Sequence, residues 1–164
     1  HDPRAPRGRG VVLGSADGLT VQPVDSRERA EAWRAVHNAI IPTAPLSLDE
    51  VVERAGRNTL ELAYVDDVVV GCSTVRPATD DEPVTVIVRV LPEHRRRGLG
   101  TRCLERALAV AEDLGAETVQ TIVLESNVEG LEFAMHRGFV ETERYVLDGD
   151  ELAYIHLARP LAPR

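Results

Sequence analysis

Apolar residues along this chain recur with two periods, which separate strand-like from helix-like segments. Short runs rich in valine, isoleucine and threonine, bounded by polar or glycine-containing turns, are typical of β-strands. Two of these runs flank Asp66-Asp67, which predicts a hairpin with a two-residue turn. We predict strands over residues 19–24, 60–65, 68–75, 84–90, 117–124, 139–147 and 151–157.

Apolar residues spaced three or four positions apart indicate four helices. The first is predicted to run from a cap at Asp25-Ser26 to about residue 41, before a proline. Ser47-Leu-Asp-Glu50 is a capping box for the second helix, which Gly56 can end. A third helix is predicted from residue 98 or 99 to 114, and a short fourth from 128 to 136.

The resulting element order, β-α-α-β-β-β-α-β-α-β-β, predicts an α/β fold. We expect a mixed, mostly antiparallel central sheet with helices on both faces. A chain of 164 residues suits one domain, which we place at 15–160. Residues 1–14 are polar, basic and rich in glycine and proline, so we expect a disordered tail or the remnant of an expression tag.

Composition narrows the function classes. The net charge of −8 argues against a general nucleic-acid-binding surface, and no apolar run is long enough to span a membrane. Cys72 and Cys103 both lie among apolar residues, which predicts buried free thiols and a reducing, cytoplasmic location. No cysteine–histidine cluster has the spacing of zinc ligands, so no metal is expected.

The stretch from Val84 to Leu108 carries the strongest functional signal. A β-branched run meets a proline, three arginines, two glycines and then a helix. Free backbone N–H groups and the positive end of the helix dipole favour an anion at such a turn, and phosphate above all. A P-loop would need Lys-Ser/Thr after Gly100, where Thr101-Arg102 stands. A dinucleotide loop would need a third glycine, where Cys103 stands, so both interpretations are weakened.

The spacing Arg95-x-x-Gly98-x-Gly100 resembles the pyrophosphate loop of the GNAT acyltransferase superfamily, Gln/Arg-x-x-Gly-x-Gly/Ala. A second segment resembles the other signature of that family, Asn-x-x-Ala-x-x-Leu/Phe-Tyr-x-x-x-Gly-Phe. The positions that match are Asn127, Phe133, Gly138 and Phe139, and Gly130 replaces the usual alanine. Because the element order is also that of the GNAT fold, the chain is identified as a member of this family.

The resemblance implies that the strand before the loop splays away from the next strand. The exposed main chain of residues 88–90 would then face the pantetheine arm and the thioester carbonyl of acetyl-CoA. Amides of residues 95–100 would hold the pyrophosphate, and glycine at 98 and 100 would let phosphate approach the backbone. The implied cofactor-binding residues are Val88, Arg89, Val90, Arg95, Arg96, Arg97, Gly98, Leu99, Gly100 and Asn127.

Two of these assignments have competing interpretations. Arg96 and Arg97 could be a solvated run of charge, because only Arg95 occupies the signature position. Asn127 would bind the pantetheine or order the end of its strand, and it can also cap the short helix that follows.

The chain departs from the family at Ala134, where many members place a tyrosine that protonates the departing thiolate. Tyr145 and Tyr154 are the remaining nearby tyrosines, and we expect both to be packing residues. Glu82 and Glu125 are the candidate general bases, because each stands next to a central strand. Direct loss of the proton to solvent is the alternative.

These points predict a cytoplasmic N-acyltransferase, more narrowly an N-acetyltransferase. It would move an acetyl group from acetyl-CoA to a primary amine of a small molecule or a peptide N-terminus, by direct attack in a ternary complex. The alternative, suggested by Ala134, is a non-catalytic acyl-CoA sensor or interaction module on the same fold. No nucleic-acid or membrane partner is expected, and strand edges could support a homodimer.

Overall fold

The computed structural model describes residues 11–12 and 18–161, and its strands form a single sheet in the order β1-β2-β3-β4-β5-β6-β8-β7. Every neighbouring pair is antiparallel except β5 and β6. The strands are β1 (Val11–Val12), β2 (Leu19–Pro23), β3 (Thr59–Val65), β4 (Val68–Arg76), β5 (Val84–Val90), β6 (Thr118–Leu124), β7 (Val140–Tyr145) and β8 (Tyr154–Pro160). The helices are α1 (Arg27–Ile40), α2 (Leu48–Arg57), α3 (Leu99–Asp113) and α4 (Val128–His136), with a 3₁₀ turn η1 (Pro92–His94). The predicted mixed, mostly antiparallel α/β fold is confirmed.

Most predicted boundaries lie within one to three residues of the structure, and three differences have a structural consequence. Val11 and Val12 pair with β2 as a short strand inside the segment expected to be a tail, whose residues 1–10 and 13–14 lie outside the described residues. Gly56 lies within α2 and does not end it, because the backbone N–H of Asn58 still bonds to the carbonyl of Arg54. The last strand begins at Tyr154 and not at 151.

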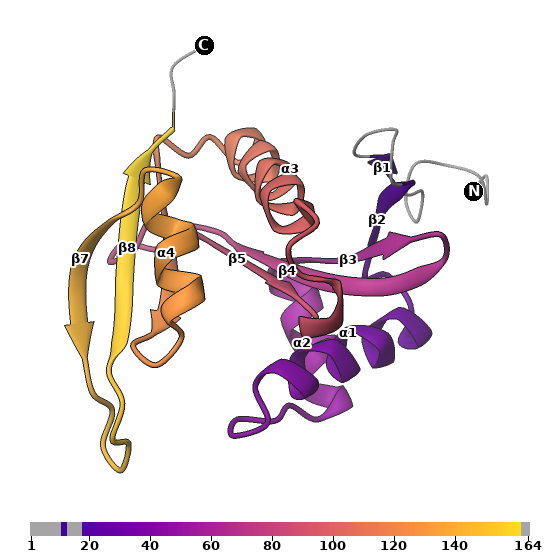
Figure 1. Ribbon diagram of the computed structural model, residues 1–164, viewed down its shortest axis with the longest axis horizontal. Coiled ribbons are helices and arrows are strands. Elements are labelled where there is room, and N and C mark those ends of the chain that lie inside the picture. Colours follow the sequence, from indigo (N-terminus) through magenta and orange to yellow (C-terminus); the bar gives the residue numbers. More distant parts are fainter. Residues whose placement is uncertain (1–10, 13–17, 162–164) are drawn as a thin grey trace.

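Helices cover both faces of the sheet around β4 and β5, with α3 on one face and α1 and α2 on the other (Figure 1). The indole of Trp33 on α1 is 1% exposed, and its Nε1 donates to the carbonyl of Ser73 on β4 over 3.2 Å. A second core joins α3 and α4 to β5, β6 and β8 through Leu104, Ala134 and Ile155. These two packed layers keep β5 in a fixed position at the centre of the sheet.

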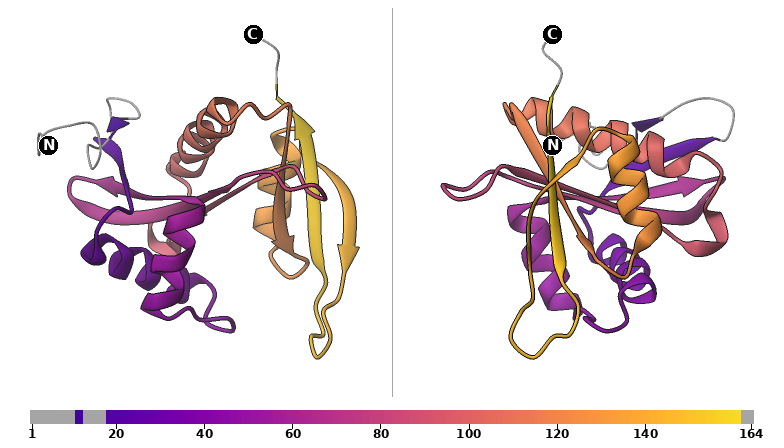
Figure 2. Two further views of the ribbon diagram at one scale, coloured as in Figure 1. Left: turned by 180° about the vertical axis from the view of Figure 1, so that it is seen from behind. Right: turned by 60° about the vertical axis from the view of Figure 1, so that its left-hand side comes forward.

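The sheet divides into two halves between β5 and β6. β6, β8 and β7 stand steeply against the plane of β3, β4 and β5, and α4 lies alongside them (Figure 2). The division places the ends of β5 and β6 apart, and the loop after β5 lies at the open side. Within the described ranges no helix is long and apolar enough to cross a membrane.

Candidate active site

β5 and β6 pair only at their beginnings and then part. The register joins Val84 to Val119 and Thr85 to Gln120, and no pair follows. The strands therefore open into the splayed arrangement that the family resemblance implies. Beyond Thr85 the edge of β5 that faces β6 has no strand partner.

The direction of each peptide group on β5 decides which groups face this opening. The backbone N–H of Leu91 bonds to the carbonyl of Val70 on β4 over 2.8 Å. Since backbone polar groups alternate along a strand, Arg89 also points toward β4, whereas Val88 and Val90 point toward β6. Because β4 already pairs with the main chain of Arg89, the register gives no support to its predicted contact with acetyl-CoA, which stays a prediction.

The loop after β5 collects unpaired backbone donors at the start of α3. Among the described residues, no acceptor bonds to the backbone N–H groups of residues 96–100. Arg96 and Gly98 both have positive φ, 65° and 75°, and alternation of left- and right-handed conformations turns successive N–H groups into one concavity. The loop and the α3 N-terminus together form a site suited to an anion.

The two glycines of the loop have different physical roles. Gly98 has open space where a Cβ would lie, so its left-handed conformation is what requires glycine. A Cβ on Gly100 would lie 3.2 Å from Cε1 of Phe133 on α4. Gly100 is therefore needed for the contact between α3 and α4, a reason that the sequence pattern did not indicate.

The three arginine side chains of the loop are partly occupied within the chain. Arg95 donates from Nε to the carbonyl of Val90 over 2.9 Å, and Arg97 contacts the Nδ1 of His94. Arg95 and Arg96 also approach the exposed carboxylate of Glu129 at 3.9 and 3.8 Å. Glu129 thus brings a negative charge to the edge of the proposed phosphate site.

Asn127 caps α4, as its competing interpretation suggested. Its Oδ1 accepts from the backbone N–H of Gly130 over 2.9 Å. A Cβ at position 130 would lie 2.5 Å from Nδ2 of Asn127, so glycine in place of the family's alanine keeps this cap in its present form. Whether Asn127 also binds the pantetheine stays a prediction.

A hydrogen-bonded chain of four side chains crosses the foot of the opening. Tyr145 on β7 contacts Nε2 of His156 at 3.0 Å, and Nδ1 of His156 contacts Oε1 of Gln120 at 3.2 Å. Gln120 Nε2 then donates to Thr85 Oγ1 over 2.8 Å. Because the oxygen of the Gln120 amide faces Nδ1 of His156, this nitrogen carries the proton. The Nε2 of His156 therefore accepts from the Tyr145 hydroxyl.

The two predicted bases lie in different surroundings. The Glu125 carboxylate accepts from the backbone N–H of Ala153 over 2.9 Å and lies 3.9 Å from Arg144. The Glu82 side chain makes no hydrogen bond or ion pair with another described residue. Burial raises the pKa of Tyr145, and the negative charge of Glu82 raises it further, which places Glu82 near the foot of the opening.

Ala134 leaves no proton donor at the position where many family members have tyrosine. It is 3% exposed and packs in the core formed by α3, α4 and the second half of the sheet.

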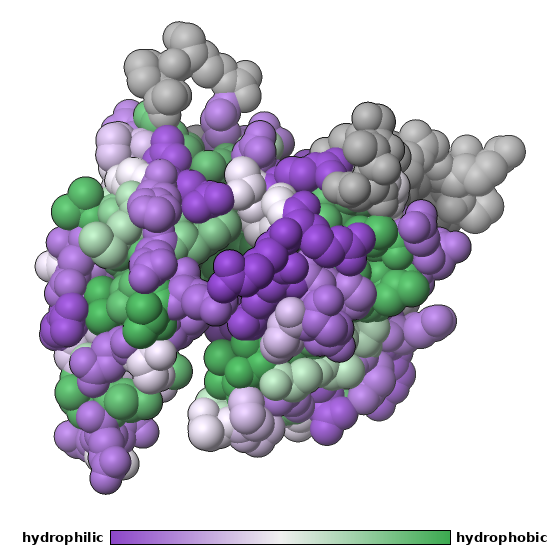
Figure 3. Space-filling view, in the orientation of Figure 1, coloured by the Kyte–Doolittle hydropathy of each residue, from purple (hydrophilic) through white to green (hydrophobic). Residues whose placement is uncertain are grey.

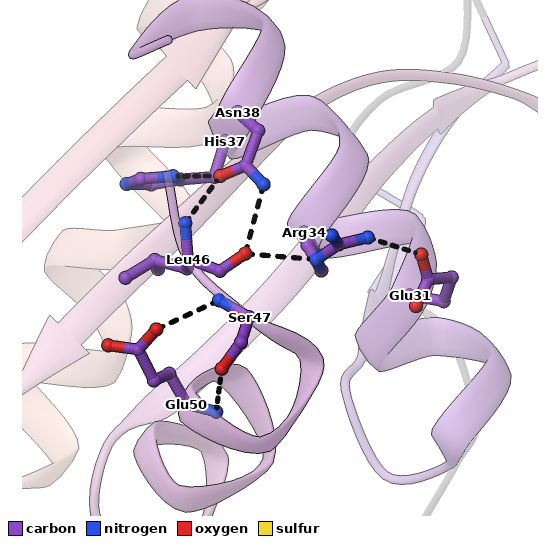
Figure 4. Close-up of polar contacts among 7 residues, drawn as sticks. All are labelled: Glu31, Arg34, His37, Asn38, Leu46, Ser47 and Glu50. Atoms are coloured by element: carbon purple, nitrogen blue, oxygen red, sulfur yellow. Dashed lines mark hydrogen bonds and ion pairs between the residues drawn. The ribbon is translucent and has the colours of Figure 1, made fainter. Parts of the chain in front are cut away.

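The connection between α1 and α2 is held in place by side-chain hydrogen bonds. Asn38 holds Leu46 through two hydrogen bonds, 2.9 and 3.0 Å long, and a capping box follows at Ser47 and Glu50 (Figure 4). The same Oδ1 of Asn38 lies 3.0 Å from Nδ1 of His37, which must therefore carry the proton. Burial lowers the pKa of His37, so the ring is neutral at pH 7 and its Nε2 carries a lone pair.

The surface view shows where ligands could enter. A notch open to solvent separates the hairpin of β7 and β8 from α1 and α2, and a band of hydrophilic side chains lies over the loop before α3 (Figure 3). The described residues contain no group of three or more side chains placed to bind a metal ion.

Known proteins share this architecture over nearly the whole chain. Ard1 of Thermoplasma volcanium has 17% identity and a TM-score of 0.75, covering 88% of this chain and 99% of that one. The ribosomal-protein-S18-alanine N-acetyltransferase of Escherichia coli has 21% identity and a TM-score of 0.70, covering 89% and 96%. The protein yncA of Salmonella typhimurium, solved with its cofactor acetyl-CoA, has 17% identity and a TM-score of 0.72, covering 89% and 95%. No curated protein sequence gives a match.

The sequence itself carries the family assignment. The profile of the acetyltransferase (GNAT) family matches residues 26–139, a segment that runs from the cap of α1 to the end of the second signature. The parted strands, the loop with its free amides and this match agree, and the chain belongs to the acetyltransferase (GNAT) family.

Proposed function

We propose that this protein is an acetyl-CoA-dependent N-acetyltransferase that acts on a primary amine of a small molecule or a peptide N-terminus. The observation that carries the proposal is the parting of β5 and β6 after Thr85, next to the loop with unpaired amides. One surface then offers donors for a thioester carbonyl and, in the loop that follows the same strand, donors for a pyrophosphate.

The backbone supplies the recognition in this proposal. The amides of residues 96–100 would bind the pyrophosphate at the N-terminus of α3. The N–H of Val88 would meet the pantetheine or the thioester oxygen, because it faces the opening without a strand partner. Rigid donors aimed at the site of developing negative charge are an effective form of electrostatic catalysis.

The reaction would proceed by direct attack of the amine. Acetyl-CoA supplies an acetyl group activated as a thioester. The new bond joins the nitrogen of the neutral amine to the carbonyl carbon, the carbon–sulfur bond breaks, and the thiolate leaves with the electron pair. The nitrogen then loses a proton to solvent, and the thiolate takes one up to give the free thiol of CoA. A thiol with a pKa near ~8.5 is a tolerable leaving group even without a proton donor, and this is how Ala134 is accommodated.

Glu82 is our candidate for the base that takes the proton from the ammonium form of the acceptor. Its carboxylate is free within the described residues and lies near Tyr145 at the foot of the opening. Glu125 remains the second candidate, although it would have to leave Ala153 and Arg144 to act.

The test is acceptor-dependent release of the CoA thiol from acetyl-CoA, measured with a panel of primary amines and short peptides. The Glu82→Gln variant should lower kcat/KM by about 10²–10⁴-fold, as expected for loss of a general base. Asp81→Asn, one residue earlier in the same exposed loop, is the matched control. Failure of acetyl-CoA to bind would contradict the proposal.

The second candidate function is a non-catalytic acyl-CoA sensor on the same fold. Ala134 is the observation that favours it, because the buried methyl group cannot donate a proton. Tight binding of acetyl-CoA with no thiol release across the whole amine panel would support this function over the enzyme.

A further inference from the structure

We call the face of the sheet that α1 and α2 cover the acceptor face. Three arginines on this side have side chains with no counter-ion among the described residues. They are Arg54 on α2, Arg76 at the end of β4 and Arg89 on β5. All three are partly buried, and none of their side chains makes a hydrogen bond or ion pair with another described residue. A cluster of partly desolvated cations is costly unless an anion joins it.

The strand register places these side chains on one face. Arg89 lies directly opposite Cys72 on β4, so both side chains leave the sheet on the same side. Cys72 packs with Trp33 and Val36 of α1, which identifies that side as the one covered by α1 and α2. Arg76 lies four residues after Cys72 along β4 and therefore leaves on the same face.

Electrostatic effects link Arg54 to each of the other two arginines. Burial lowers the pKa of Arg89, and the charge of Arg54 lowers it further. Burial also lowers the pKa of Arg54, with Arg57 and Arg76 as the next causes. The charges of Arg89 and Arg54 also lower the pKa of His37. The unprotonated Nε2 of His37 is directed away from Asn38.

The acids that act on Arg54 are already engaged. Glu50 and Glu53 on α2 are close enough to act on Arg54, but Glu50 is bound to Ser47 in the capping box and Glu53 pairs with Arg57 at the helix surface. Neither acid forms a hydrogen bond or ion pair with Arg54.

The other face of the sheet provides a contrast. There Arg106 on α3 makes two hydrogen bonds to Glu61, at 3.1 and 2.9 Å, in the forked geometry that arginine forms with a carboxylate. On this face, where no ligand is expected, the partly buried Arg106 therefore has a carboxylate partner within the fold. The three arginines on the acceptor face lack the carboxylate that Arg106 has.

We propose that Arg54, Arg76 and Arg89 form a subsite for a carboxylate carried by the acceptor, so that the substrate is an amino acid or a similar amine with a carboxylate beside it. The inference rests on the proposed acetyltransferase function and specifies its substrate class. The carboxylate would bind between α2 and β5 while the amine reaches the opening next to Val88. The notch between α1–α2 and the β7–β8 hairpin is the entry route (Figure 3).

The direct test compares free amino acids with their amides, in which a neutral carboxamide replaces the carboxylate. In the thiol-release assay with acetyl-CoA, the best amino acids should exceed their amides by about tenfold or more in kcat/KM, because charged hydrogen bonds to arginine are lost in the amide. Equal or better turnover of the amides would overturn the subsite and favour uncharged amines or peptide N-termini.

Substitutions of the arginines test whether they cause the preference for amino acids over amides. Arg89→Leu and Arg54→Leu should each raise KM for the amino acid about tenfold or more and leave KM for the amide unchanged. Arg57→Leu, on the same helix but exposed and paired with Glu53, is the matched control. Equal effects of Arg89→Leu on both series would contradict the proposal.

A binding measurement separates this inference from the proposed function. Succinate is titrated into the full chain while the Nε–Hε signals of the arginines are followed by NMR, and acetyl-CoA binding is measured separately by calorimetry. Saturable shifts at Arg89 and Arg54 are expected with or without turnover. If acetyl-CoA binds but succinate causes no saturable shift, the subsite is wrong; if acetyl-CoA fails to bind, the proposed function is wrong and the succinate result still decides the subsite.

Discussion

Gln120 donates a hydrogen bond to Thr85 over 2.8 Å, across the last pair of residues that β5 and β6 share. Both side chains are buried, and the other end of the Gln120 amide orients His156. This contact joins the two halves of the sheet at the point from which they diverge. The position of the opening therefore depends on a side-chain hydrogen bond as well as on the strand ladder.

The first prediction concerns this contact. Gln120→Leu leaves the hydroxyl of Thr85 and the Nδ1–H of His156 without their partner, so it should lower the free energy of unfolding by about 1–3 kcal/mol in urea titrations. Gln22→Leu is the control, because the buried Oε1 of Gln22 has no partner among the described residues. Equal losses in the two variants would contradict a specific role for the Gln120 bond.

The second prediction separates packing from ligand approach at Gly100. An added methyl group would meet the edge of the Phe133 ring, whose face already packs against the guanidinium of Arg137, 3.8 Å from the ring centroid, so the ring has little freedom to adjust. Gly100→Ala should lower the free energy of unfolding by about 1–2 kcal/mol. The double variant Gly100→Ala/Phe133→Leu should recover part of that loss. Unchanged stability with weaker acetyl-CoA binding would instead support the phosphate-approach role predicted from the sequence.

The third prediction concerns the carboxylate beside the loop. Glu129 lies within 4 Å of two loop arginines and would repel a phosphate. Glu129→Gln should tighten acetyl-CoA binding by a few-fold at low salt, since exposed charges contribute about 0.2–1 kcal/mol, and the gain should shrink as salt is added. Glu132→Gln, exposed on the same helix, should have no such effect. Weaker binding by Glu129→Gln in calorimetry would contradict this role.

The fourth prediction is a pH effect on stability at His37. Burial holds the pKa of His37 below its ordinary value of 6.5, so the unfolded chain binds the proton more readily than the folded chain does. The stability that the neutral His37 ring provides is fully present above pH 6.5. It is lost as the pH falls through 6.5 toward the pKa of His37 in the folded chain. His37→Gln should flatten the acid side of the stability profile, measured by urea titration at several pH values. An unchanged profile, equal to that of the exposed-site control His136→Gln, would show that His37 is not the group involved.

Much of the fold follows from local sequence patterns. The Asp66-Asp67 turn shows why: both residues adopt positive φ, 49° and 68°, as a two-residue hairpin turn requires, and the flanking runs then pair as predicted. The capping box at Ser47 likewise forms as expected. Gly56 does not end α2 as predicted, because its backbone does not adopt the left-handed conformation with which a glycine ends a helix.

The site depends on relationships that no local pattern contains. The register of β4 against β5 decides that Val88 and Val90 face the opening while Arg89 does not. The arginine cluster joins α2, β4 and β5, and its members are far apart in the sequence. The contact between Gly100 and Phe133 links the two family signatures to each other, so a motif predicted to bind phosphate also determines how α3 packs on α4.

The most direct test of the central claim is an amide-resolved NMR titration of the full chain with acetyl-CoA. The structure predicts saturable shifts at the amides of Val88 and Val90, which face the opening, and at residues 96–100, which have no acceptor among the described residues. The amide of Arg89, which is paired with β4, should shift less. No saturable binding, or shifts that leave β5 and the loop unaffected, would contradict the assignment of this opening as the acetyl-CoA site.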